Sequence, residues 1–249
     1  MAYDTERRMT GRFGAGAYAP AEAAEIDAGL RAYMLRVYNY MASGLLLSGV
    51  VAMLIANNDS IGSLFYQTTE RGVGYTGLGW ISVFGTLGLI FMMNGRRSVA
   101  TLQGMYWAFV ALMGVSLAAS LMIYTGVSVA RTFFITAGSY GMLSLYGYTT
   151  KKDISGWGSF LFMGLIGIVI ASLVNIFLGS AMIHFVVSTV GVLVFAGLTA
   201  YDTQRIKNSY FEVGGTDAEE HSAIMGAVSL YLNFINLFQL LLSFFGNRE

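Results

Sequence analysis

Apolar stretches of about 20 residues recur along most of the chain, separated by short polar segments. A helix needs about 20 apolar residues to cross roughly 30 Å of hydrocarbon at 1.5 Å per residue, so each stretch predicts a membrane-spanning helix. The pattern predicts seven such helices, near residues 33–56, 76–93, 102–124, 130–148, 157–178, 182–203 and 222–245. The fourth is the least apolar, because Thr136, Ser139, Tyr140 and Ser144 lie within it. The predicted fold class is therefore all-α, a polytopic membrane protein with one compact seven-helix bundle.

The predicted helices divide the chain into a polar N-terminal tail, residues 1–32, and a transmembrane domain, residues 33–249. The tail mixes arginines with several acids, and we expect it to be cytoplasmic, with a short amphipathic helix near residues 21–31. It is too long and too acidic for the n-region of a signal peptide. The longest predicted loops are residues 57–75, between the first two spans, and residues 204–221, between the last two.

The composition supports this class. Hydrophobic residues make up 55% of the chain and charged residues 11%, against about 25% charge in an average soluble domain. Gly accounts for 31 of the 249 residues, and small residues let membrane helices approach closely. The net charge of zero gives no basic field for nucleic acid, and the absence of Cys excludes disulfides and thiolate sites. A disordered chain and a soluble enzyme of the usual kind are excluded.

The basic residues predict the orientation, because cytoplasmic loops of membrane proteins are enriched in Lys and Arg. With a cytoplasmic N-terminus, ten basic residues fall inside: Arg7, Arg8, Arg12, Arg31, Arg96, Arg97, Lys151, Lys152, Arg205 and Lys207. Three fall outside: Arg71, Arg131 and Arg248. Seven spans then leave the C-terminus outside.

Several patterns resemble catalytic or binding motifs without the context that such motifs need. GVGYTG at residues 72–77 has the spacing of a dinucleotide fingerprint, but we predict no strand before it and no βαβ unit around it. His184 and His221 are expected on opposite membrane faces, so they cannot share a metal or complete a hydrolytic triad. A retinal protein needs a Lys in its last helix, and the seventh predicted span has none. We therefore expect no enzymatic activity, no cofactor and no bound metal.

Asp202 is the one acidic residue within an apolar segment. It lies five residues before Lys207, so about 8 Å from the inner end of its helix at 1.5 Å per residue. It is either an interfacial acid paired with Arg205 one turn later or a proton- or cation-linked carboxylate inside the bundle, the usual role of an intramembrane acid. Polar partners are available in Asn233 and Asn236 of the seventh span, whereas Asn175 of the fifth is expected to form an interhelical hydrogen bond.

Three stretches carry a resemblance to a known family. LTAYDTQRIK ends the sixth predicted span, AVSLYLNFINLFQLLLSFFGNR forms the seventh, and RTFFITAGSYGMLSLYGYTTKKDISGWGSF covers the fourth and the loop after it. They resemble the Bax inhibitor family, including its bacterial YccA-like members, and the similarity covers residues 31–247. The family implies six helices around a central seventh and a pH-sensitive Ca²⁺ leak. Its bacterial members lie in the inner membrane, where we expect this protein.

The resemblance also implies roles for particular residues. In the family, an aspartate on the sixth helix and one on the seventh form the pH sensor, and an arginine ending the second helix latches onto the former in the closed state. Asp202 matches the first aspartate, and Arg96, or its neighbour Arg97, matches the arginine. Asn233 stands where the second aspartate is expected, and an amide cannot share a proton with Asp202, so a coupled titration of two carboxylates is not expected.

Two hypotheses of function follow. The first is a pH-modulated Ca²⁺ leak in a bacterial inner membrane, with Asp202 lining the cytoplasmic mouth, Arg96 closing it and Asn233 as a neutral neighbour. The alternative is a membrane-embedded regulator that conducts no ions and binds other membrane proteins, for example a membrane protease. Membrane lipid is a partner in both hypotheses, and Ca²⁺ is the permeant ion only in the first.

Overall fold

The computed structural model describes residues 15–69, 72–95 and 97–247, with side chains from residue 26 onward. Over these residues the chain forms eight helices and one two-stranded sheet. In chain order the elements are α1 (Ala15–Ala56), α2 (Asp59–Phe65), β1 (Tyr66–Thr69), β2 (Gly72–Tyr75), α3 (Gly77–Met93), α4 (Val99–Ile123), α5 (Gly126–Thr149), α6 (Trp157–Leu178), α7 (Ala181–Val213) and α8 (Glu219–Phe245). A helix is present at each of the seven predicted places.

Five helices in the described part of the chain are long and apolar enough to cross a membrane: α1, α4, α6, α7 and α8. The apolar helix α3 has only 17 residues, slightly below the usual length of a span. The 24-residue helix α5 is long enough, but buried hydroxyl groups recur along it and it is not one of the five. The protein is therefore an all-α polytopic membrane protein, and the crossings by α3 and α5, the second and fourth predicted spans, stay predictions.

Two helices extend beyond the predicted spans, because hydropathy reports contact with lipid and not helicity. The sixth predicted span ended at residue 203, but α7 continues as a helix to Val213. The loop predicted over residues 204–221 is therefore limited to the short connection before Glu219. Likewise α1 begins at Ala15, so the amphipathic segment predicted near residues 21–31 is continuous with the first span. Residues 1–14 of the predicted tail lie outside the described residues.

The loop predicted over residues 57–75 contains the short helix α2 and an antiparallel hairpin. Tyr66 of β1 lies opposite Tyr75 of β2, and Thr69 lies opposite Gly72, whose φ of +109° suits glycine at the turn. The prediction that no strand precedes GVGYTG was wrong, since β1 precedes this motif and β2 forms its first four residues. A dinucleotide fingerprint nevertheless needs a strand of a parallel βαβ unit, and this strand belongs to a hairpin.

Short connections between the helices are stabilised by local capping. The hydroxyls of Ser98, Thr125 and Ser180 each accept a hydrogen bond from a backbone N–H in the first turn of α4, α5 and α7. Gly179 ends α6 in the left-handed conformation, with φ of +61°. These caps let each helix turn back beside the previous one within a few residues.

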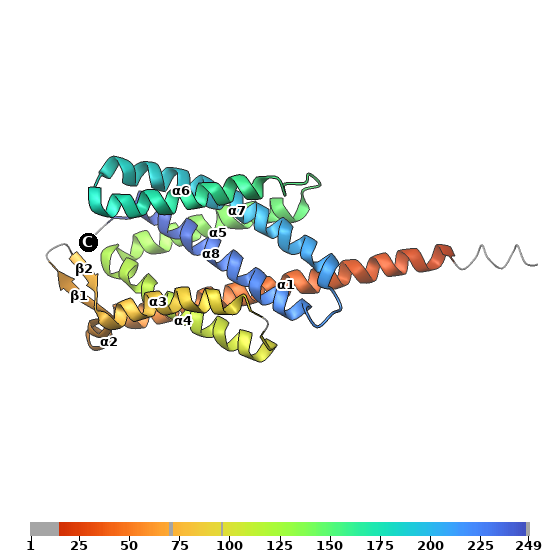
Figure 1. The fold of residues 1–249 in the computed structure, drawn as a ribbon, viewed down its shortest axis with the longest axis horizontal. Helices are drawn as coiled ribbons and strands as arrows, with labels where there is room; N and C mark the ends of the chain where they lie inside the picture. The colour runs from red at the N-terminus through yellow and green to blue at the C-terminus, as the bar shows by residue number, and fades with distance from the viewer. Residues whose placement is uncertain (1–14, 70–71, 96, 248–249) are drawn as a thin grey trace, which may run out of the picture.

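The C-terminal helix α8 lies in the middle of the bundle and packs against α1, α4, α5 and α7 (Figure 1). Among its fully or almost fully buried side chains are Leu230, Tyr231 and Leu237. The helix α3 packs on α4, and α6 packs on α7, so both lie further out. A polar group on α8 is therefore placed in the interior of the protein.

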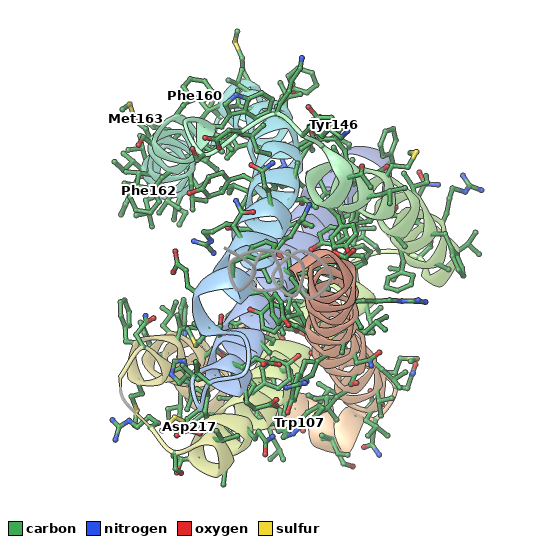
Figure 2. All side chains as sticks on the ribbon, turned by 90° about the vertical axis from the view of Figure 1, so that its right-hand side faces the viewer. Trp107, Tyr146, Phe160, Phe162, Met163 and Asp217 are labelled. Atoms are coloured by element: carbon green, nitrogen blue, oxygen red, sulfur yellow. The ribbon has the colours of Figure 1, made fainter. Side chains whose placement is uncertain are left out.

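The outward surface of the bundle is apolar. Phe160, Phe162 and Met163 of α6 point away from the other helices in the view along the bundle (Figure 2). Many large apolar side chains of α3, α5 and α7 are exposed as well. Such a surface is unfavourable in water and suits contact with lipid.

Candidate functional site: a buried carboxylate beside a polar cleft

Asp202 is the acidic side chain that the fold buries most deeply among the described residues, with only 7% of the residue exposed. Its Oδ1 lies 2.8 Å from Nη2 of Arg205, one turn later on α7. Its Oδ2 accepts a hydrogen bond of 2.7 Å from Nδ2 of Asn233 on α8. A buried charge is costly unless it is paired and hydrogen-bonded, and these two contacts meet both conditions.

The contact between Asp202 and Asn233 depends on the extension of α7. The sequence predicted Asp202 about 8 Å from the inner end of its helix. Counted from the predicted start of the seventh span at residue 222, Asn233 lies eleven residues, or about 16 Å, from the inner end of its own helix, so the two were expected at different depths. Because α7 ends at Val213, Asp202 lies 11 residues, or about 16 Å, from that end. Asn233 lies 14 residues, or about 21 Å, from the start of α8 at Glu219. In antiparallel neighbours these depths bring the two side chains together.

Arg205 links the carboxylate to the surface. Its side chain is 52% exposed, and Nη2 also donates to Oγ of Ser229 at 3.2 Å. Its guanidinium lies 5.9 Å from the ring centre of Tyr201, within the range of a cation–π contact. One of the two interpretations of Asp202 predicted an ion pair with Arg205. This ion pair is present, together with the hydrogen bond from Asn233.

The arginine latch that the family resemblance implies stays a prediction. Arg96 lies outside the described residues. Its alternate, Arg97, follows α3 in an exposed position and forms no ion pair with any described residue. Among the arginines whose side chains are described, Arg205 is the one that contacts Asp202.

A chain of hydroxyl groups runs from the residue after Asp202 toward α1. Oγ1 of Thr203 donates to the carbonyl of Thr199 at 2.8 Å, so this hydroxyl can only accept from Ser144 of α5, at 3.0 Å. Ser144 then accepts from the Tyr38 hydroxyl at 2.5 Å. Buried polar groups thus connect α7 with α5 and α1.

Two more residues of the LTAYDTQRIK stretch bind α7 to the last turn of α5 and to the connection between α5 and α6. Gln204 accepts from the backbone N–H of Ile154 at 3.0 Å and donates to the carbonyl of Lys152 at 2.8 Å. Lys207 donates to the carbonyl of Tyr148 at 2.8 Å. In the same connection the N–H of Ser155 donates to Asp153 at 2.9 Å and lowers the pKa of that exposed carboxyl below its ordinary value.

An open cleft of about 1030 Å³ lies between α6, α7 and α8, and Asp202 is part of its wall. It extends along α7 from His184 to Arg205, 21 residues or about 32 Å, close to the thickness of the hydrocarbon core. Polar side chains from one face of α8 line it: Ser229, Asn233, Asn236, Gln239 and Ser243. The wall formed by α6 is mainly apolar.

Asn175 and Asn236 do not form the interhelical bonds that amides often form in membranes. Oδ1 of Asn175 accepts from the backbone N–H of Ser180, so this residue stabilises the turn between α6 and α7. Nδ2 of Asn236 donates to the carbonyl of Leu232 within α8. The interhelical role predicted for Asn175 was wrong, because the residue lies in the last turn of its helix.

An ion-pair cluster that the sequence analysis missed joins α1, α4 and α8 at the end of the bundle where α8 begins. Arg36 lies 2.8 Å from Glu220 and 3.3 Å from Glu219. The Tyr40 hydroxyl donates to Glu220 at 2.8 Å and accepts from Gln103 at 2.7 Å. The sequence contained one sign of this cluster, since Arg36 is a cation one turn inside the first predicted span. Its acidic partners lie about 180 residues away in sequence, so the pairing could not be predicted from spacing.

These features define an integral membrane protein in which a central helix carries a stripe of polar side chains past a buried, ion-paired carboxylate. The chain belongs to the Bax inhibitor family, because the family model described as "Inhibitor of apoptosis-promoting Bax1" matches residues 30–249. The resemblance noted in the sequence is thereby confirmed.

Bacterial relatives align with nearly the whole chain. An uncharacterised protein of Rickettsia prowazekii is 48% identical over 90% of this chain and 92% of its own. One of Caulobacter vibrioides is 48% identical over 92% and 95%. The inner membrane protein YbhL of Escherichia coli is 44% identical over 89% and 94%.

Proposed function

We propose that this protein is a pH-modulated Ca²⁺ leak of a bacterial inner membrane. The observation that carries the proposal is the buried carboxylate of Asp202, held between Arg205 and Asn233 on the wall of a cleft as long as the membrane is thick. An ionisable group inside a membrane is costly to insert and typically serves ion or proton movement.

The chemistry of these groups suits a hard cation. Ca²⁺ binds carboxylate, amide and hydroxyl oxygens, and Asp202 is the carboxylate that faces the cleft. In the arrangement observed here, Arg205 occupies Oδ1 and therefore competes with a cation. Protonation of Asp202 would remove its attraction for both Arg205 and Ca²⁺, and this gives the leak its dependence on pH. Arg96 or Arg97 can contribute a second latch from the end of α3, as the family resemblance implies.

The proposed location and orientation have independent support. The Escherichia coli relative is named an inner membrane protein. The connections from α3 to α4, from α5 to α6 and from α7 to α8 lie at one end of the bundle (Figure 1). They contain or adjoin Arg97, Lys151, Lys152 and Lys207, and this supports a cytoplasmic location of that end of the bundle, because cytoplasmic loops are enriched in Lys and Arg.

Ca²⁺ flux in proteoliposomes tests the proposal. Wild-type protein should conduct with a rate that changes with pH, and Asp202→Asn should abolish most of that change. Asp153→Asn is the matched control, since its carboxyl is exposed in a connection outside the cleft and stays ionised at physiological pH. A wild-type protein without flux would refute the leak and support the regulator hypothesis instead. An Asp202→Asn variant with an unchanged pH profile would refute the role of Asp202.

A further inference from the structure

The stripe on α8 is unusual because it lines an open cleft, although Ser229, Asn233 and Ser243 also hydrogen-bond to side chains of α7. Its polar members recur at intervals of three or four residues from Ser229 to Ser243, 14 residues or about 21 Å along one helix face. Polar side chains in membrane helices normally face other helices and hydrogen-bond across them. Here the facing wall from α6 is mainly apolar and offers few partners.

The stripe also has free hydrogen-bonding capacity. Asn236 uses its Nδ2 within α8, and over the described residues its Oδ1 accepts no hydrogen bond. The Gln239 amide forms none with any described residue. Amides left unpaired against lipid chains are strongly unfavourable, because they lose the hydrogen bonds that water would provide. Water in the cleft removes that cost, whereas a lipid acyl chain in the cleft does not.

We infer that the cleft between α6, α7 and α8 is the aqueous path of the leak, along which a hydrated cation moves between the His184 end of the bundle and Asp202. The oxygens of Asn236, Gln239 and Ser243 replace part of its hydration shell on the way. This inference rests on the proposed function, and it names the route and the residues that line it. The ion pair of Asp202 with Arg205 blocks the path at the end opposite His184.

The chain has no Cys, so a single introduced Cys is the only thiol in the protein. We would introduce Asn236→Cys, Gln239→Cys and Ser243→Cys one at a time. A charged, membrane-impermeant methanethiosulfonate would then be added to the outer side of right-side-out membrane vesicles, and modification measured by mass. Such a reagent reacts only with thiols that water reaches.

Two variants on neighbouring surfaces serve as controls. Leu193→Cys places the thiol on the exposed apolar side of α7 at a depth between Gln239 and Asn236, outside the cleft. Leu237→Cys places it in the buried core beside α8, outside the cleft. Both thiols should resist the reagent if water reaches the protein interior only through the cleft. Modification of either control would indicate that the reagent enters through the lipid or through a partly unfolded protein.

We expect modification at the three cleft positions, none at the two controls, and at least a several-fold loss of Ca²⁺ flux after modification at Gln239→Cys. Unreactive cleft positions in a protein that conducts would overturn the path and leave the leak standing. Reactive positions whose modification leaves the flux unchanged would also overturn it. Wild-type vesicles without flux would instead overturn the proposed function, which separates the two failures.

Discussion

Asn233→Asp is the substitution that the site makes most informative. The amide nitrogen of Asn233 is 2.7 Å from Oδ2 of Asp202, so an aspartate of nearly the same shape would place a second carboxylate in direct contact with the first. Two unit charges about 4 Å apart repel by about 4 kcal/mol at an effective dielectric constant of about 20. The pair would therefore hold one proton between its two carboxylates and release it in a separate step.

The size of the effect follows from that repulsion. Each 1.4 kcal/mol is a tenfold change in proton affinity, so 4 kcal/mol separates two titration steps by about three pH units. Arg205 lies 2.8 Å from Asp202 and offsets part of the repulsion, so we expect a separation of roughly one to three pH units. Wild-type leak should titrate in one weak step, whereas Asn233→Asp should add a second step at higher pH.

The assay is Ca²⁺ flux into dye-loaded proteoliposomes over a series of pH values. Asn236→Asp is the control, because it adds a carboxylate to the same cleft, one turn away, at a side chain that bonds to Leu232 and not to Asp202. A second step in the control as well would attribute the effect to added charge alone. An Asn233→Asp profile identical to that of the wild type would refute the direct contact of the two side chains as the basis of pH sensing.

Three further predictions concern orientation, the ion pair and helix packing. A reporter fused after Glu249 should be active only if it suits the external compartment, and cytoplasmic activity would show that an odd number of the seven predicted helices fails to cross. Arg205→Gln should raise the Ca²⁺ leak near neutral pH several-fold and Arg205→Lys should not. Equal leak rates in the two variants would indicate that Arg205 contributes only to the positive charge of the cytoplasmic side. Gly147→Ala should lower the free energy of unfolding in detergent by about 1–3 kcal/mol, because its Cβ would lie 2.3 Å from a backbone oxygen of α7. Gly138→Ala, whose Cβ would meet nothing within 4 Å, should be neutral or slightly stabilising, and equal effects of the two would argue against close packing of α5 on α7.

The sequence by itself determined the class of the protein and the position of each long helix. Lipid selects for long apolar runs, and the backbone hydrogen bonds of such a run can be satisfied only within a helix, so the pattern and the structure have one cause. The same reasoning singled out Asp202, because an acid stands out in an apolar segment whatever surrounds it. Hydropathy could not locate the end of α7, since a helix that leaves the lipid becomes polar without unwinding.

The tertiary structure alone decided which groups meet. The sequence distance between Asp202 and Asn233 is 31 residues, and their contact depends on the extension of α7 and on its antiparallel packing with α8. The cleft has the same origin, because the stripe from Ser229 to Ser243 becomes a lining only where α6 and α7 leave one face of α8 uncovered. Composition and spacing give the face of a helix on which a residue lies. What that face meets is determined by how the helices pack, which depends on all of their side chains together.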